Sequence, residues 1–339
     1  MGNYIKGVND ELLFQAERNL FSFSGLDYDT FKISNVPIDE TGNYVRTFDI
    51  PAQNLTSEKP PTLVLIHGYG GFAAIFYKII KDIVEAGIHL IMIDIIGMGT
   101  SSRPEFNRDQ SSDEADAYFV DFIEKWRVAY GSLTDFYLAG HSFGGYISAL
   151  YALKYKQNIK KLLMLSPVGV CVKPEDFDVK KLQKGRGPPK FIRKMFMSAW
   201  ENKWSPFGVM RKTGSWGGKK MVNYYLNRRI GDALNDEERE HMATYMHQCF
   251  MREGSTEYAI FICFELGLYA VNPLELENRL GTPEFDLPVS FIYGDIDWMD
   301  YRGGQRILDK NKHKDGLSNL YIVSNCDHHL YLDNPKEFG

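Results

Sequence analysis

A serine stands at the centre of the segment with the clearest chemical signature in the chain, Gly140-His141-Ser142-Phe143-Gly144. The apolar run from Phe136 to Ala139 precedes it and a helical pattern follows, so the sequence predicts a strand, a tight turn and a helix. Glycines two residues before and after Ser142 suit this turn, because a side chain at either position would collide with the neighbouring strand or helix. The context predicts a nucleophilic serine held above a sheet, with the helix N-terminus favouring negative charge beside it.

A serine hydroxyl needs a base, which a histidine paired with a carboxylate normally supplies. Of the eight histidines, His328 and His329 alone follow the last predicted strand, Leu320 to Val323, and precede a helix start at Asp333-Asn334-Pro335. We predict His328 as the base, because its spacing from that helix is the usual one. We interpret His329 as a structural neighbour.

The carboxylate that orients the histidine is expected after the penultimate strand, in Gly294-Asp295-Ile296-Asp297-Trp298-Met299-Asp300. Asp297, three residues past the glycine, is the predicted acid. Asp300 competes with it, and Asp295 is a weaker candidate because loop aspartates commonly bond to nearby backbone.

An oxyanion formed on the substrate would need two backbone N–H donors. The segment Leu65-Ile66-His67-Gly68-Tyr69-Gly70-Gly71 ends an early buried strand and can turn one amide toward Ser142. We predict the amides of Tyr69 and Phe143 as the two donors. His67 is interpreted as a structural residue that packs under the loop.

The elements that must position these residues follow an alternating pattern. Two alternating stretches, 31–38 and 44–51, flank a turn and predict an antiparallel hairpin. Continuous apolar runs then predict parallel strands buried on both faces, at 62–66, 89–96, 136–139, 161–165, 289–293 and 320–323. Helical patterns lie between them, at 72–86, 115–130, 146–156 and 303–312. The predicted fold class is therefore α/β, with a mostly parallel sheet and helices on both faces.

A long segment interrupts this alternation between two strand signals, and it is too long for a simple crossover. We predict an inserted helical cap at residues 171–284, between a first part of the core at 1–170 and a second part at 285–339. Within the cap, residues 180–220 contain twelve Lys or Arg and one acid, Glu201.

The composition excludes several other classes of protein. A formal net charge of -5 gives no basic balance for nucleic acid, and no apolar run of membrane-spanning length occurs. No metal-ligand spacing and no dinucleotide- or phosphate-binding glycine motif is present, so we expect chemistry without a cofactor. The four cysteines are widely spaced and no secretory leader is visible, which predicts a cytoplasmic protein.

With these residues in place, the chain resembles the lipid-acting branch of the α/β-hydrolases, which contains lysophospholipase-like acylhydrolases and the lipid-droplet co-activator of triacylglycerol lipase. The similarity extends from about Thr62 to Phe338. Besides the serine motif it rests on the oxyanion segment and four further stretches, Asp94 to Pro104, Trp204-Ser205-Pro206, Asn227-Arg228-Arg229 and Gly294 to Met299.

The resemblance implies hydrolysis of a carboxylic ester in a phospholipid, lysophospholipid or N-acyl phospholipid through an acyl-enzyme on Ser142. Members of this branch are also said to carry a His-x4-Asp acyltransferase motif, which His328 to Asp333 matches. That spacing also arises in an ordinary hydrolase whose histidine precedes a helix capped by Asp. The co-activator-like members carry Asn in place of Ser142, so the serine favours an enzyme over a scaffold.

The cap combines cations with aromatic residues, which suits contact with an anionic membrane or lipid droplet. The aromatic residues are Phe191, Phe196, Trp200, Trp204, Phe207 and Trp216. A solvated basic face is the plainer interpretation. Arg228 and Arg229 could bind a phosphate head group, and an internal ion pair is the alternative.

Three rival functions remain open for the whole chain. They are a proline iminopeptidase, a scaffold that activates a partner lipase, and an acyl-CoA-dependent lysophosphatidic acid acyltransferase.

Overall fold

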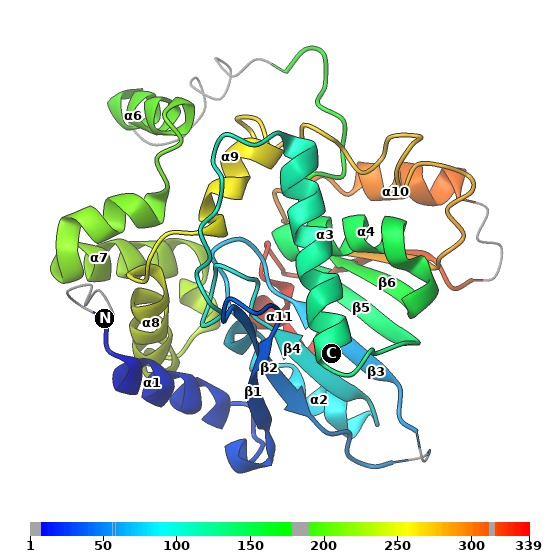
Figure 1. The fold of residues 1–339 in the computed structure, drawn as a ribbon, viewed down its shortest axis with the longest axis horizontal. Coiled ribbons are helices and arrows are strands. Elements are labelled where there is room, and N and C mark those ends of the chain that lie inside the picture. Colours follow the sequence, from blue (N-terminus) through cyan, green and yellow to red (C-terminus); the bar gives the residue numbers. More distant parts are fainter. Residues whose placement is uncertain (1–7, 56, 58, 178–189, 312–315) are drawn as a thin grey trace.

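The computed structural model describes residues 8–55, 57, 59–177, 190–311 and 316–339. The described residues form one eight-stranded sheet in the order β1-β2-β4-β3-β5-β6-β7-β8 (Figure 1). The strands are β1 (Lys32–Pro37), β2 (Tyr44–Ile50), β3 (Thr62–Ile66), β4 (His89–Ile93), β5 (Phe136–His141), β6 (Ile159–Leu165), β7 (Val289–Gly294) and β8 (Asn319–Val323). Strands β3 to β8 are parallel to one another, whereas β1 and β2 form an antiparallel hairpin whose β2 pairs antiparallel with β4. The predicted fold class is confirmed.

Helices cover both faces of this sheet. They are α1 (Asp10–Ser22), α2 (Ile80–Glu85), α3 (Ser112–Ala129), α4 (Phe143–Tyr155), α6 (Lys190–Glu201), α7 (Pro206–Arg229), α8 (Asp236–Phe250), α9 (Ile260–Cys263), α10 (Arg302–Lys310), α11 (Leu330–Asp333) and α12 (Pro335–Phe338). The helix predicted at 72–86 is instead a 3-10 turn at Ala73–Phe76 followed by α2. Ala73 donates its N–H to the Asp94 carboxylate, so this backbone is bound to the core.

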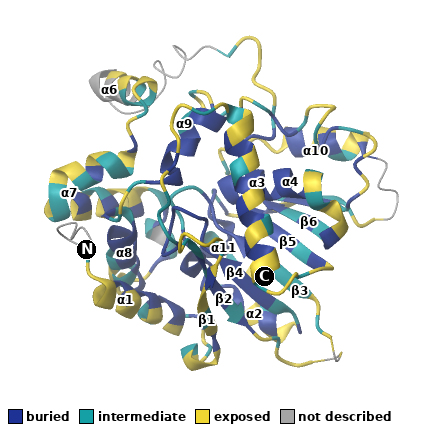
Figure 2. Ribbon diagram, viewed as in Figure 1, coloured by how far each residue is buried: buried dark blue, intermediate teal, exposed yellow. Residues whose placement is uncertain are grey.

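The core lies in two layers because successive strand residues point to opposite faces. In β3, Val64 and Ile66 belong to the cluster beneath α3 and α4, whereas Leu65 belongs to the cluster beneath α1 and α8. The central strands are correspondingly dark and the outward sides of the helices are exposed in Figure 2. Burial on both faces explains why the parallel strands appear in the sequence as continuous apolar runs.

The carboxyl ends of the parallel strands meet at one edge of the sheet, which is where ligands bind in such folds. His67 follows β3, Ser142 follows β5, Asp297 comes after β7, and His328 comes after β8. The topology therefore gathers all the predicted site loops at one edge.

Helices α6 to α9 occupy the segment between β6 and β7 that was predicted as the cap. Ser205 caps the N-terminus of α7 and Pro206 occupies its first turn, as the Trp204-Ser205-Pro206 pattern favours. Gly214 has φ 72° and interrupts the helical backbone of α7. Helix α8 packs against α1, where Tyr245 donates its hydroxyl hydrogen to Glu17 at 3.1 Å. Across the described ranges, we find no helix with the length and apolarity to cross a bilayer.

Candidate active site

Ser142 occupies a strained turn between β5 and α4. Its φ of 54° and ψ of -114° lie where residues other than glycine are rarely found. A Cβ added to Gly140 would lie 2.3 Å from the Gly144 carbonyl oxygen, and one added to Gly144 would lie 2.3 Å from the His67 carbonyl oxygen. Only glycine fits at these two positions, which accounts for the glycine spacing in the sequence. The turn leaves Ser142 half-buried while its neighbours in the motif are buried.

The amides predicted as oxyanion donors flank this serine. Phe143 is the first residue of α4, so its N–H has no acceptor within the helix. Neither this N–H nor that of Tyr69 donates to any acceptor among the described residues. Gly68, directly before Tyr69, packs on the serine, because a Cβ added there would lie 3.0 Å from Ser142 Cβ. The two free donors are thus at the start of α4 and in the loop after β3, and that loop packs on Ser142 through Gly68.

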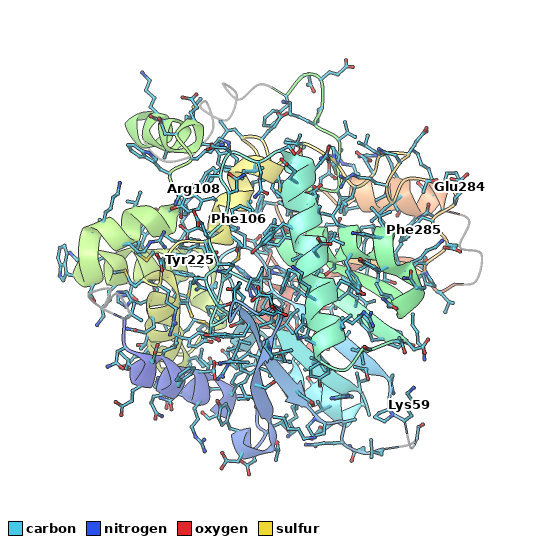
Figure 3. All side chains as sticks on the ribbon, in the orientation of Figure 1. Lys59, Phe106, Arg108, Tyr225, Glu284 and Phe285 are labelled. Carbon is cyan, nitrogen blue, oxygen red and sulfur yellow. The ribbon has the colours of Figure 1, made fainter. Side chains whose placement is uncertain are left out.

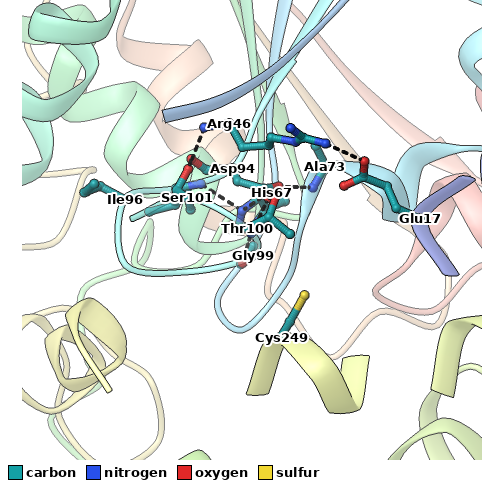
Figure 4. A network of polar contacts seen from close by, with 12 residues as sticks. Glu17, Arg46, His67, Ala73, Asp94, Ile96, Gly99, Thr100, Ser101 and Cys249 are labelled. Atoms are coloured by element: carbon teal, nitrogen blue, oxygen red, sulfur yellow. Dashed lines mark hydrogen bonds and ion pairs between the residues drawn. The ribbon is translucent and has the colours of Figure 1, made fainter. Parts of the chain in front are cut away.

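A buried polar network holds the loop that carries Tyr69 (Figure 4). Ile95 donates its N–H to His67 Nε2 at 2.9 Å, which places the proton of His67 on Nδ1, 2.7 Å from the Gly68 carbonyl oxygen. Burial lowers the pKa of His67, so this imidazole is neutral. Asp94 accepts from the amides of Ala73 and Thr100, both at 2.6 Å. His67 and Asp94 therefore fix the loop, and His67 has the structural position expected of it.

The structure brings Asp297 and His328 together. Asp297 Oδ1 lies 3.2 Å from His328 Nδ1 and also accepts the Met299 N–H at 3.0 Å. Burial opposes ionisation of Asp297, but the hydrogen bond and charge of His328, with the Met299 amide, hold its pKa below the ordinary value. The Trp298 ring lies against the imidazole, with 5.1 Å between centroids. Asp297 is therefore an ionised carboxylate beside His328.

The two competing carboxylates have other partners. Asp300 accepts from the backbone N–H and the guanidinium of Arg302, at 3.0 and 2.8 Å. Asp295 accepts the Cys326 N–H at 3.0 Å. Of the three aspartates, Asp297 is the one that contacts His328.

The loop of His328 contacts the serine turn through His141, and the Ser142 hydroxyl makes no hydrogen bond to any residue in the described ranges. His141, the neighbour of Ser142, has its Nε2 2.9 Å from the His328 carbonyl oxygen, and the two rings are 4.7 Å apart. Hydrogen bonds of this kind often form only when a substrate is bound. Along the carboxyl edge of the sheet, Ser142 follows β5, Asp297 comes after β7 and His328 comes after β8.

Helix α7 lies over the site and touches it at both ends. In its first turn, the Phe207 ring packs 5.6 Å from the Tyr69 ring. In its last turn, the Arg229 guanidinium lies 5.7 Å from the Trp298 ring. Arg228 is exposed and donates to the Tyr224 hydroxyl at 3.1 Å. Of the predicted arginine pair, the structure brings Arg229 to the site and leaves Arg228 on the surface.

Asp333, the acid of the His-x4-Asp pattern, faces the loop before His328. Its Oδ2 accepts the Asp327 N–H at 3.0 Å. Burial raises the pKa of Asp333 to about 6. The bond from Asp333 to the Asp327 backbone fixes the shape of the loop, and this accounts for the four-residue spacing between His328 and Asp333.

Sequence reasoning missed three residues that build this site: Asp94, Tyr225 and Tyr331. Asp94 had a usable signal, since it follows a buried strand at the same sheet edge. Tyr225 and Tyr331 reach the site through tertiary contacts described below, and a tyrosine on a helix gives no such signal.

Comparison with known proteins identifies the family of this chain. The family model of the alpha/beta hydrolase fold matches residues 61–335, and the chain belongs to this family. A carboxylesterase from Bacillus subtilis, CesB, shares the fold, with a TM-score of 0.62 and 15% identity over 96% of this chain and 94% of that one.

Within the family, the chain falls in the lipid-related branch. It is 32% identical to a 1-acylglycerol-3-phosphate O-acyltransferase of Arabidopsis thaliana, covering 87% of this chain and 68% of the relative. It is 30% identical to a (lyso)-N-acylphosphatidylethanolamine lipase of Mus musculus, covering 82% of this chain and 76% of the relative.

Proposed function

We propose that this protein hydrolyses a carboxylic ester through an acyl-enzyme on Ser142. His328 takes the proton as the serine oxygen attacks the acyl carbon, and Asp297 orients the ring and stabilises its cation. The amides of Tyr69 and Phe143 bind the oxyanion. The alcohol leaves with the proton from His328, and water then releases the acid by the same steps. The observation that carries the proposal is the Asp297–His328 contact of 3.2 Å beside a strained, half-buried serine.

We further propose a phospholipid or lysophospholipid as the substrate, with Arg229 at its phosphate. Arg229 forms no close ion pair with a carboxylate among the described residues, and it lies over Trp298, which lies over His328. A guanidinium can bind two phosphate oxygens at once. Two relatives whose names refer to phosphate-bearing lipids support the same class of substrate.

The test is hydrolysis of a mixed phospholipid and lysophospholipid panel, with products identified by mass spectrometry and Ser142→Ala as the blank. Arg229→Gln is expected to raise KM for a lysophospholipid about tenfold, because a hydrogen bond to a charged group is worth about 1.5–3 kcal/mol. KM for an uncharged monoacylglycerol should stay unchanged. Equal effects on both substrates would remove Arg229 from the phosphate site.

Acyl transfer is the second candidate, because the Arabidopsis relative carries that name. In this reaction a lysophospholipid hydroxyl would replace water as the acceptor of the acyl group. Adding acyl-CoA to the same panel separates the two: diacyl product dependent on Ser142 would favour the transferase, and free fatty acid would favour the hydrolase.

We also propose that α7 contacts an anionic lipid surface, which would bring the site to its substrate. The helix carries six Lys or Arg and no acid. Trp216 is 73% exposed with Lys220 Nζ 3.8 Å from its ring centroid, and Trp204 is 58% exposed. Residues 178–189 of the basic stretch and the side chains of Phe191 and Phe196 lie outside the described residues.

Replacing Trp216 and Lys220 together with serine is expected to weaken binding to phosphatidylserine vesicles at least about fivefold. One cation near such a surface contributes about 1 kcal/mol, and the ring adds to this. Co-sedimentation measures the effect, with Tyr321→Ser, an exposed aromatic residue on β8, as the matched control. Unchanged sedimentation of the double variant would show that this part of α7 does not contact the vesicle.

A further inference from the structure

Four side chains link the cap to the loop of His328 through consecutive hydrogen-bond contacts. The Tyr225 hydroxyl lies 3.4 Å from His329 Nε2, and His329 Nδ1 lies 3.1 Å from the Tyr331 hydroxyl. The same hydroxyl lies 3.3 Å from His141 Nδ1, and His141 Nε2 lies 2.9 Å from the His328 carbonyl oxygen. Tyr225 belongs to α7 and is labelled in Figure 3. We refer to Tyr225, His329, Tyr331 and His141 as the tyrosine–histidine chain.

The donor and acceptor of every hydrogen bond in the tyrosine–histidine chain follow from its last bond, which joins His141 to the His328 carbonyl oxygen. A carbonyl oxygen only accepts, so His141 Nε2 must carry a proton and donate to His328. A neutral imidazole has one such proton, so His141 Nδ1 accepts from the Tyr331 hydroxyl. The Tyr331 oxygen then accepts from His329 Nδ1–H, and His329 Nε2 accepts from Tyr225.

This assignment requires both histidines to be neutral, and their surroundings agree. Burial, with the neighbouring His328, lowers the pKa of His141 to about 3. Burial likewise lowers the pKa of His329 well below its ordinary value. Each ring therefore carries one proton and makes one donated and one accepted bond.

The outer end of the chain belongs to α7, whose last turn contacts both loops of the acid–base pair. Tyr225 and Arg229 are four residues apart and share one face of the helix. Tyr225 bonds to His329, next to His328, while Arg229 lies over Trp298, next to Asp297. The position of this turn is thereby coupled to both loops.

We propose that Tyr225, His329, Tyr331 and His141 are positioning residues that hold the backbone of His328 against the serine turn and couple it to the cap. His141 adjoins Ser142 and binds the His328 carbonyl, so the chain sets the distance between base and nucleophile. This inference rests on the proposed function. Small displacements of a catalytic group have large effects on rate, because its orientation supplies much of the acceleration.

The test uses two hydroxyl deletions, Tyr225→Phe and Tyr331→Phe, and a soluble p-nitrophenyl ester. Each single variant is expected to lower kcat about fivefold with KM unchanged, in keeping with the loss of one hydrogen bond. The double variant should match Tyr331→Phe alone, because removing Tyr225 adds nothing once the chain is broken. Tyr224→Phe, the neighbouring exposed tyrosine, is the matched control and should equal the wild type.

Two results would overturn the proposal: a wild-type kcat in Tyr225→Phe, or effects of the two deletions that multiply in the double variant. If Tyr331→Phe lacks a cooperative thermal transition, Tyr225→Phe decides alone, since the Tyr225 residue is 38% exposed whereas Tyr331 is buried. Labelling by a fluorophosphonate separates this proposal from the proposed function. Loss of labelling in Ser142→Ala with wild-type rates in both tyrosine variants would refute the chain and leave the hydrolase standing.

Discussion

Replacing Ser142 with alanine is expected to abolish covalent labelling by a fluorophosphonate and to lower ester turnover at least about 10⁴-fold. In serine enzymes, loss of the nucleophile leaves only the contribution of the oxyanion donors and substrate binding. The strained backbone at Ser142, with φ 54°, is retained in the variant because the glycines on either side are unchanged. Gel fluorescence of the labelled protein and an ester assay measure the two effects.

Ser148→Ala is the matched control for this experiment. Ser148 lies on α4, the helix that follows Ser142, and its buried hydroxyl has no hydrogen-bond partner among the described residues. Its removal leaves no polar group unpaired, so labelling and stability should be unchanged or slightly improved. Labelling that persists in Ser142→Ala would assign the nucleophile to another residue.

Replacing Asp297 with asparagine is expected to lower kcat on the order of 10⁴-fold while the protein stays folded. The amide has nearly the size of the carboxylate, but it can donate to His328 Nδ1 and so favour the wrong tautomer. The low pKa of Asp297 means that the carboxylate is ionised at neutral pH. Kinetics on a soluble ester, together with a thermal melt, distinguish this effect from unfolding.

Asp300→Asn is the control, since it removes the same charge from the same loop. The Asp300–Arg302 ion pair is exposed, and such pairs contribute little to stability. We expect kcat to stay within about threefold of the wild-type value, because an exposed charge that does not contact His328 has only a small effect. A large loss in Asp300→Asn with a small loss in Asp297→Asn would exchange the two assignments.

Most of the sheet could be predicted because its central strands are buried on both faces and its edge strands still carry apolar residues in sequence. The boundaries of β3 agree with the predicted run, and those of β6 and β8 differ by two residues or fewer. Helix α1 was not predicted, although Leu13, Ala16 and Leu20 form an apolar face at helical spacing. That pattern could have revealed the helix, but not its partner α8, which lies more than two hundred residues away in the chain.

The site residues likewise fall into those with a local sequence signal and those that only tertiary packing reveals. The glycines around Ser142 and the residues after β7 and β8 have local spacing, so their approach to one edge follows from parallel topology. The choice between Arg228 and Arg229 depends on which side of α7 faces Trp298, and this required the packing of the cap. Tyr225 and Tyr331 become meaningful only through contacts with His329 and His141.

His141 has a further consequence for the fate of the serine proton. A second imidazole beside a nucleophile would ordinarily offer a rival route for that proton. Here both ring nitrogens of His141 already have partners, and burial keeps its pKa at about 3. In the proposed mechanism, the proton from Ser142 therefore has one destination, His328, and the positive charge that appears during reaction stays beside Asp297.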